Sequence, residues 1–140
     1  MRISAVAAAC FLAVCFLIGA PTLALADATG TYNVVGRNAD DGSTYKGTVE
    51  VTRSGATYKV VWVIGGQKSV GTGLGSHFEN AGNTYATGPA SDKDTGLSVG
   101  YTNKDSYGIA IYYKQSDGSW KGVWTYGGSQ RITSETWTPQ

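Results

Sequence analysis

The sequence predicts an all-β protein, a single antiparallel up-and-down β-barrel of about eight strands. Apolar and polar residues alternate with period two along most of the chain, and glycine-rich turn signals separate the alternating runs. No stretch after residue 26 has the 3.6-residue apolar period of a helix. Short strands joined by short turns favour pairing between sequence neighbours, and closing such a sheet removes its exposed edges. A two-layer β-sandwich is the alternative.

Residues 1–26 have the features of a secretory signal peptide. One arginine precedes an apolar run over residues 5–20, and the segment finishes with Ala24 and Ala26. This Ala-x-Ala pattern predicts cleavage before Asp27. A membrane anchor is disfavoured because the run is short for a span and no basic stop-transfer residues follow it. We therefore expect a secreted or periplasmic protein with no membrane span in the mature chain.

The mature chain, residues 27–140, is long enough for a single β-barrel domain but not for two domains. Both cysteines, Cys10 and Cys15, lie in the signal segment, so the mature domain has no disulfide and no cysteine metal ligand. Its ten Lys and Arg balance ten Asp and Glu and are scattered singly. Nucleic-acid-binding surfaces usually carry a basic patch, so we expect no nucleic-acid partner.

The first four strands are expected near residues 31–37, 44–53, 57–64 and 67–74. Turn signals at 54–55 and 65–66 bound the third strand and make a tight hairpin with the second. The apolar face of the second strand comprises Tyr45, Gly47, Val49 and Val51. The apolar face of the third comprises Tyr58, Val60, Trp62 and Ile64.

The last four strands are expected near residues 97–102, 107–114, 119–126 and 131–138. A further short strand is expected within 77–88, where the alternation is weaker. The positions expected to face solvent include the charged residues Lys46, Glu50, Lys59, Lys121 and Glu135. A barrel in an outer membrane would turn an apolar band outward, so these charges favour a soluble barrel.

The stretch DGSTYKG at 41–47 returns as DGSWKG at 117–122. Asp-Gly between two alternating runs is a strong hairpin signal because glycine adopts a positive φ without strain. Gly47 and Gly122 each follow an aromatic by two residues, and a glycine inside a barrel strand permits a sharp bend that an aromatic ring covers. We interpret the repeat as architecture. A calcium loop is disfavoured because Val49 stands where the twelfth ligand is required.

Signals for catalysis are weak, so we predict a non-enzymatic protein without catalytic residues, metal or cofactor. His77 is the only histidine, no serine sits in a Gly-x-Ser-x-Gly elbow, and the cluster at 65–75 lacks the spacing of a phosphate loop. Asp92 and Asp94 are neighbours in a polar loop. A small hydrolase would need His77 within hydrogen-bond reach of a carboxylate at a pocket rim. A hydrolase of this kind or a protease inhibitor is the third alternative.

The aromatic residues are the best candidates for a binding site. Four of them are expected on inward faces, where they either fill the core or form the wall of a pocket for a small apolar ligand: Tyr58, Trp62, Tyr113 and Trp124. Tyr126 is expected inward as well. Tyr112 and Trp137 are expected on the outer surface, where they offer contacts to an extracellular macromolecule.

Two segments, GTYNVVGRNADDGSTYKGTVEVTRSGATYKVVWVIGGQKSVGTGLG and AIYYKQSDGSWKGVWTYGGSQRITSETWTP, resemble small secreted bacterial β-barrel proteins. Most of these are hypothetical, and some are automatically labelled fibronectin-binding proteins. The resemblance covers most of the mature chain and marks 76–96 as an insertion. It implies an exported bacterial protein and makes adhesion to a host or matrix macromolecule the alternative to binding a small ligand.

The tripeptide GTY at 30–32 is similar to the Gly-x-Trp that opens the first strand of lipocalin-like and avidin-like barrels. This similarity implies that Tyr32 takes the place of the tryptophan. It also implies that Arg131, at the last strand, covers that ring.

Overall fold

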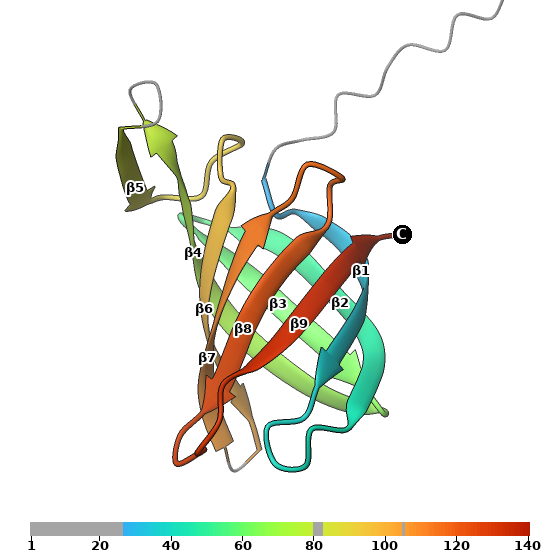
Figure 1. The fold of residues 1–140 in the computed structure, drawn as a ribbon. Helices are drawn as coiled ribbons and strands as arrows, with labels where there is room; N and C mark the ends of the chain where they lie inside the picture. Colours follow the sequence, from blue (N-terminus) through green and yellow to red (C-terminus); the bar gives the residue numbers. More distant parts are fainter. Residues whose placement is uncertain (1–26, 80–82, 105) are drawn as a thin grey trace, which may run out of the picture.

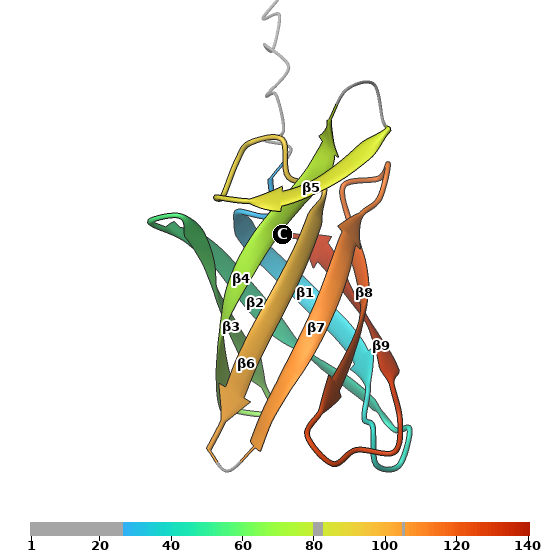
Figure 2. The same ribbon diagram turned by 90° about the vertical axis from the view of Figure 1, so that its left-hand side faces the viewer.

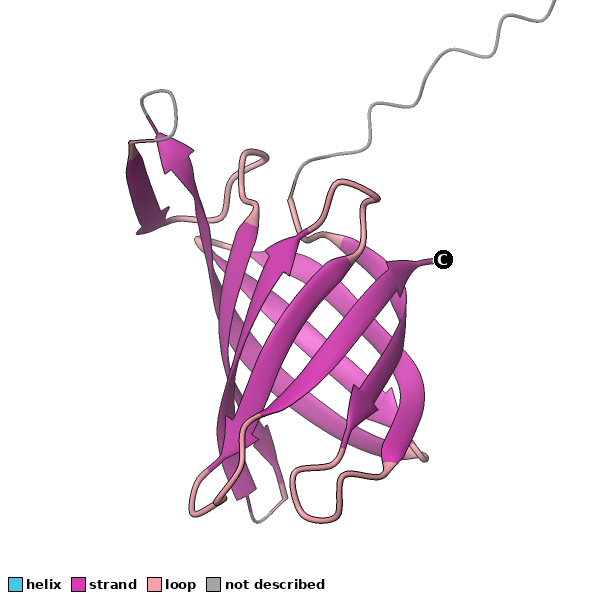
Figure 3. Cartoon of the chain, viewed as in Figure 1, coloured by secondary structure: helices cyan, strands magenta, loops and turns pink. Residues whose placement is uncertain are grey.

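A computed structural model describes residues 27–79, 83–104 and 106–140, and all regular structure in these ranges is β-strand (Figure 3). The predicted signal peptide at 1–26 lies outside the described residues. Within the described ranges no helix is long and apolar enough to cross a membrane.

Nine strands follow one another along the chain. They are β1 (Gly30–Arg37), β2 (Thr44–Ser54), β3 (Thr57–Ile64), β4 (Gln67–Glu79), β5 (Thr84–Gly88), β6 (Gly96–Asn103), β7 (Ser106–Lys114), β8 (Trp120–Tyr126) and β9 (Thr133–Pro139). The eight main strands and the additional short strand are confirmed. Most boundaries agree with the prediction to within two residues, but β4 continues five residues beyond the expected end at residue 74.

Eight of the strands close into an antiparallel barrel, which confirms the predicted fold class and excludes the sandwich. The order β3-β2-β1-β9-β8-β7-β6-β4 is closed by the pairing of β3 with β4, and β5 adds to the free length of β4 (Figures 1 and 2). The turns β1–β2, β3–β4, β6–β7 and β8–β9 lie at one end, which we call the open end. The described N-terminus, the C-terminus and the turn β7–β8 lie at the other, the capped end (Figure 1).

The described residues of the segment 76–96, expected as an insertion, project beyond the barrel at the capped end (Figure 1). The last residues of β4 pair with β5, so that Ser76 opposes Thr87 and Glu79 opposes Thr84. The chain then returns through residues 89–95 and enters β6 (Figure 2). The projection is therefore a β-hairpin whose return loop passes over one mouth of the barrel.

The repeated Asp-Gly-Ser sequence has the same local geometry in two turns whose lengths differ by one residue. Gly42 has a φ of 72° and Gly118 a φ of 82°, in the left-handed region that glycine enters without strain. The aspartate before each glycine accepts a hydrogen bond from the serine amide after it, at 2.8 Å from Ser43 N to Asp41 Oδ1 and 2.9 Å from Ser119 N to Asp117 Oδ1. The interpretation of the repeat as architecture therefore agrees with this geometry.

The two strand glycines of the repeat lie beneath the side chain that opposes them on the neighbouring strand. Gly122 is covered by Tyr112 on β7 and Gly47 by Ile64 on β3. A Cβ atom at Gly122 would come within 2.3 Å of both the Tyr112 ring and the Ile111 carbonyl oxygen. The expected covering of a bare backbone thus occurs, but across the strand pair and not from the aromatic two residues earlier.

The predicted orientation of β7 is wrong. Tyr112 is 1% exposed and faces the interior, whereas Tyr113 is 51% exposed and points outward. Both faces of this strand look apolar in the sequence, and the row with more large side chains is the outer one. The inner row contains Gly108 and Ala110, because the Tyr101 ring from β6 occupies the space above Gly108.

The predicted orientation of β9 is wrong as well. Glu135, expected in solvent, is only 4% exposed, and Trp137, expected on the surface, is fully buried. The two residues share the inner face of β9 by strand alternation. Trp137 packs on Tyr112 with ring centroids 3.9 Å apart, and this packing determines which face of the strand is inside.

The expected pairing of Arg131 with Tyr32 is absent from the described residues. Tyr32 lies near the capped end, where its hydroxyl donates to the Ala28 carbonyl at 2.8 Å and its ring contacts Trp137. Arg131 lies at the open end, where it donates to the carbonyl oxygen of Asp40 at 3.3 Å. A tryptophan from the last strand therefore takes the position that the similarity assigned to arginine.

Candidate functional site

A cavity of about 330 Å³ occupies the half of the barrel next to the open end. Its wall combines aromatic side chains with small polar ones near the turns: Asn38, Tyr45, Trp62, Ile64, Gln67, Ser69, Tyr101, Asn103, Ser106, Tyr112, Trp124, Tyr126 and Glu135. Gln67 and Ser106 are exposed, so the cavity reaches the surface between the β3–β4 and β6–β7 turns. Size, shape and one-sided access are those of a site for one small molecule.

Glu135 is the polar centre of this cavity. Its Oε1 accepts hydrogen bonds from Tyr112 Oη at 2.8 Å, from Trp62 Nε1 at 3.0 Å and from Trp137 Nε1. Its Oε2 accepts a further bond from Tyr45 Oη. These four donors come from β2, β3, β7 and β9, so one carboxylate links strands around the whole barrel.

Four aromatic rings form a contiguous wall around the cavity. Tyr45 and Trp124 have ring centroids 6.2 Å apart and an interplanar angle of 63°; Trp124 and Tyr101 are 6.5 Å apart at 68°. Tyr101 and Trp62 continue the wall at 5.8 Å and 56°. The planes of neighbouring rings are thus steeply inclined to one another, so the four rings partly surround the space between them.

Burial and Glu135 both act against the ionisation of three tyrosines that line the cavity. Burial raises the pKa of Tyr101 to about 12, with a smaller contribution from the Glu135 charge. Burial raises the pKa of Tyr45 and of Tyr112 well above the ordinary value, and the hydrogen bond of each hydroxyl to Glu135 raises it further. Tyr45 and Tyr112 are therefore fixed hydrogen-bond donors to the carboxylate.

Two buried polar atoms beside the cavity have no hydrogen-bond partner among the described residues. They are the indole nitrogen of Trp124 and the hydroxyl oxygen of Thr133, and these residues oppose one another in the β8–β9 pair. The indole of Trp124 lies near the Tyr45 hydroxyl and slightly opposes the rise in the pKa of Tyr45. The contact between the two groups lacks hydrogen-bond geometry. Unpaired buried donors cost free energy, which a binding partner can recover.

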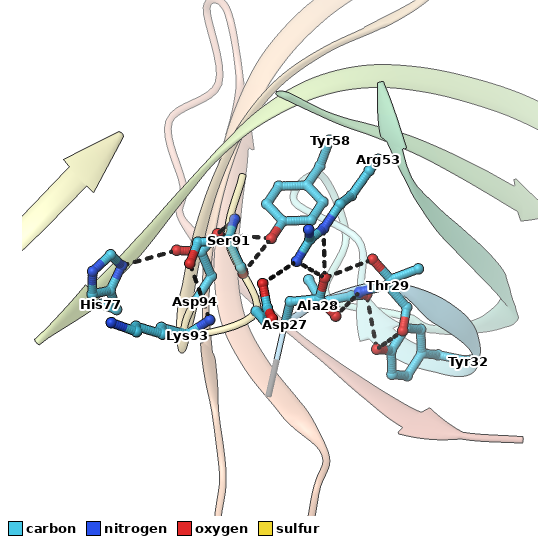
Figure 4. A network of polar contacts seen from close by, with 11 residues as sticks. Asp27, Ala28, Thr29, Tyr32, Arg53, Tyr58, His77, Ser91, Lys93 and Asp94 are labelled. Atoms are coloured by element: carbon cyan, nitrogen blue, oxygen red, sulfur yellow. Dashed lines mark hydrogen bonds and ion pairs between the residues drawn. The ribbon is translucent and has the colours of Figure 1, made fainter. Parts of the chain in front are cut away.

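The capped end is closed by a separate polar network (Figure 4). Asp94, 1% exposed, accepts from Tyr58 Oη at 2.7 Å and from the Ser91 amide at 2.7 Å. Arg53 joins Asp27 at 2.8 Å and Asp92 at 3.2 Å, which ties the N-terminal segment to the return loop. These contacts close the end opposite the cavity mouth.

His77 belongs to the capped end and contacts two carboxylates. Its Nδ1 is 3.1 Å from Asp94 Oδ1, and its Nε2 is 3.7 Å from Glu79 Oε1. A histidine acting as general base for a hydroxyl nucleophile would direct its second nitrogen at that hydroxyl. Asp94 is the carboxylate that a hydrolase would require within reach of His77, but the second ring nitrogen of His77 faces the carboxylate of Glu79.

The structure brings together two of the four predicted ligand-binding residues, Trp62 and Trp124. Tyr58 faces inward as expected but is used at the capped end, hydrogen-bonded to Asp94. Tyr113 lies outside the barrel, in a shallow hollow that also contains Phe78 and Tyr85.

The cavity residues that were missed as site candidates include Tyr45, Tyr101, Tyr112 and Glu135. For Tyr45 the signal was available, because its place on the apolar face of the second strand was recognised. For Glu135 the misleading signal was its charge, which favours solvent unless a buried carboxylate has several donors.

No protein-family model matches this sequence. No curated protein matches it either.

Proposed function

We propose that this protein is an exported, non-enzymatic binding protein that holds a small, largely apolar molecule inside its barrel, in the manner of lipocalin-like proteins. The observation that carries the proposal is the cavity of about 330 Å³ at the open end, with aromatic walls and polar groups at its mouth and base. Cavities of this kind, mostly apolar with a few convergent polar groups, are the usual form of small-molecule sites.

The placement of the aromatic residues supports a pocket over a filled core. The rings at the capped end, such as Trp120 and Trp137, are fully buried and pack without reaching solvent. Tyr45, Tyr101 and Trp124 are only partly buried, although the barrel encloses them. Large rings left partly uncovered inside a domain lose stabilisation that a ligand restores on binding. Export to the periplasm or the medium rests on the sequence of residues 1–26.

The test is native mass spectrometry of the protein purified from its own source, before and after denaturation. A mass difference is expected for the wild type and should disappear in Ser69→Phe, because Ser69 lines the cavity and the added ring occupies it. Val70→Phe is the matched control, since Val70 is the next residue of β4 and points outward. A wild type with a bare mass, or a ligand retained in Ser69→Phe, would argue against the proposal.

Adhesion to an extracellular protein is the second candidate. The observation in its favour is the outer face of β7, where four consecutive outward side chains are apolar or aromatic and exposed: Tyr107, Ile109, Ile111 and Tyr113. Surface rows of this kind occur at protein-binding sites. Titration of the protein over immobilised fibronectin tests this candidate, and a lack of saturable binding would count against it.

A further inference from the structure

We infer that the molecule held in the cavity is an organic cation of the quaternary ammonium type, with a compact alkylated charged group and an apolar or weakly polar remainder. The inference rests on the proposed function, because it names the ligand class of the same site. Three features of the cavity carry it: the sign of its charge, the use of its hydrogen-bond acceptors and the arrangement of its rings.

The charge of the cavity is negative. Glu135 is the one acidic residue among the residues that line it, and the described lining contains no lysine, arginine or histidine. The four partners of the carboxylate are hydroxyl and indole donors, which carry no net charge. In a barrel interior of low dielectric a single negative charge acts over several ångströms, so a positive ligand gains and a negative ligand loses affinity.

The hydrogen bonds of Glu135 determine which kind of cation fits. Oε1 already accepts three bonds, and Oε2 accepts one from Tyr45. A primary ammonium or a guanidinium would have to displace one of these donors from Oε1 or share Oε2 with the Tyr45 hydroxyl. An alkylated ammonium has no N–H group and interacts with the carboxylate through its charge alone, so it leaves the network intact.

The ring geometry is that of an aromatic cage. Tyr45, Trp124, Tyr101 and Trp62 follow one another at centroid separations of 5.8–6.5 Å with interplanar angles of 56–68°. A flat aromatic ligand would prefer two parallel walls, whereas inclined walls surround a rounded group. Tryptophan and tyrosine rings attract cations through their quadrupoles, and cages of this kind recognise quaternary ammonium groups.

The remaining charges near the mouth do not reverse this preference. The β1–β2 turn carries Asp40 and Asp41, and Arg37 at the end of β1 and Arg131 both lie against it. Lys68 and Lys104 are exposed and adjoin lining residues at the mouth. Asp40 accepts a hydrogen bond from Tyr126, one of the lining residues. Charged groups of both signs therefore surround the entrance, and Glu135 is the one charged residue among the described residues that line the cavity.

The experiment compares two probes of nearly equal shape, choline and its uncharged isostere 3,3-dimethylbutan-1-ol, by titration calorimetry with the purified protein. We expect choline to bind at least about tenfold more tightly, as a desolvated cation–π site implies. In Glu135→Gln, which retains the shape of the side chain, the ratio should fall below about threefold, while binding of the alcohol changes little. Circular dichroism and the melting temperature establish that the variant is folded.

A second variant keeps the test decisive if Glu135→Gln does not fold. Trp124→Leu removes one wall of the cage without breaking a hydrogen bond, because the Trp124 indole nitrogen has none among the described residues. It should weaken choline more than the alcohol. Val123→Leu, at the preceding outward position of β8, is the matched control and should leave both affinities unchanged.

Each outcome decides the inference. Equal binding of the two probes, or tighter binding of the alcohol, overturns the cation assignment and leaves the binding function standing. A preference for choline that persists in folded Glu135→Gln and in Trp124→Leu places the cation elsewhere and overturns the assignment to this cavity. If neither probe binds, the inference fails, and the native mass measurement decides separately whether the binding function fails with it.

Discussion

Replacing Tyr112 by phenylalanine tests whether Glu135 holds the barrel together. The hydroxyl of Tyr112 donates to Glu135 Oε1 at 2.8 Å, and the residue is 1% exposed, so the hydrogen bond is shielded from solvent. Phenylalanine retains the ring and its contact with Trp137, at a centroid distance of 3.9 Å. The substitution therefore removes one hydrogen bond and very little packing.

The expected cost is about 1.5–3 kcal/mol of the free energy of unfolding, the usual contribution of a buried hydrogen bond to a charged acceptor. With a urea dependence of about 2 kcal/mol per molar, typical for a domain of this size, the unfolding midpoint should fall by about 1 M. Urea titration monitored by circular dichroism measures the shift. Tyr107→Phe is the matched control, because Tyr107 lies on the same strand with 70% of its surface exposed and should change stability by less than about 0.5 kcal/mol.

A double-mutant cycle with Glu135→Gln identifies the partner of the lost bond. If the carboxylate is the acceptor, Tyr112→Phe should cost less in the Glu135→Gln background, near the range of about 0.5–1.5 kcal/mol for a neutral pair. A single-mutant cost within about 0.5 kcal/mol of zero, or an identical cost in both backgrounds, would refute the reasoning.

Two further predictions concern pH and the glycines of the wall. Burial raises the pKa of Tyr101 to about 12 from an ordinary value near 10, so the unfolded chain releases this proton at a lower pH than the folded protein does. The contribution of Tyr101 to the free energy of unfolding should therefore be complete below about pH 10 and decline as the pH rises towards 12. Urea unfolding midpoints across this pH range measure the decline. Gly36→Ala should weaken binding of the cavity ligand, because a Cβ there would meet the Tyr45 ring at 2.3 Å and push it into the lumen. Gly100→Ala, which meets nothing within 4 Å, should bind as the wild type does, and equal binding by both variants in the same calorimetric titration would contradict the argument.

The barrel could be predicted from the sequence because each strand is bounded by a turn with its own chemical signal. Gly42 and Gly118 follow aspartate between alternating runs, and both adopt the positive φ that such hairpin turns require. Closure also followed from the sequence, because nine short antiparallel strands in one sheet leave two free edges unless the sheet closes. These signals are local, so no tertiary information was needed.

The site could be predicted only in part, because the orientation of a strand with two apolar faces is decided by its neighbours. Tyr112 and Tyr113 are adjacent and identical, and the packing of Tyr112 on Trp137 and its hydrogen bond to Glu135 select the inner one. Glu135 is buried because donors from three other strands converge on it, and that convergence exists only in the closed barrel. Trp62 was placed correctly because Thr57 and Lys59 mark the outer face of its strand.

The glycines and the cavity have a common origin in the cross-strand pairs. Three of the tyrosines that line the cavity lie over a glycine on the adjacent strand: Tyr45 over Gly36, Tyr101 over Gly108 and Tyr112 over Gly122. A Cβ at any of these glycines would come within 2.4 Å of the ring, so each ring can lie flat against the wall only because the opposing residue has no side chain. The same glycines let the strands bend sharply enough to close the barrel. Closing a small barrel and leaving a cavity at its centre are therefore achieved by the same residues, which is why a chain so rich in aromatic side chains does not fill its own interior.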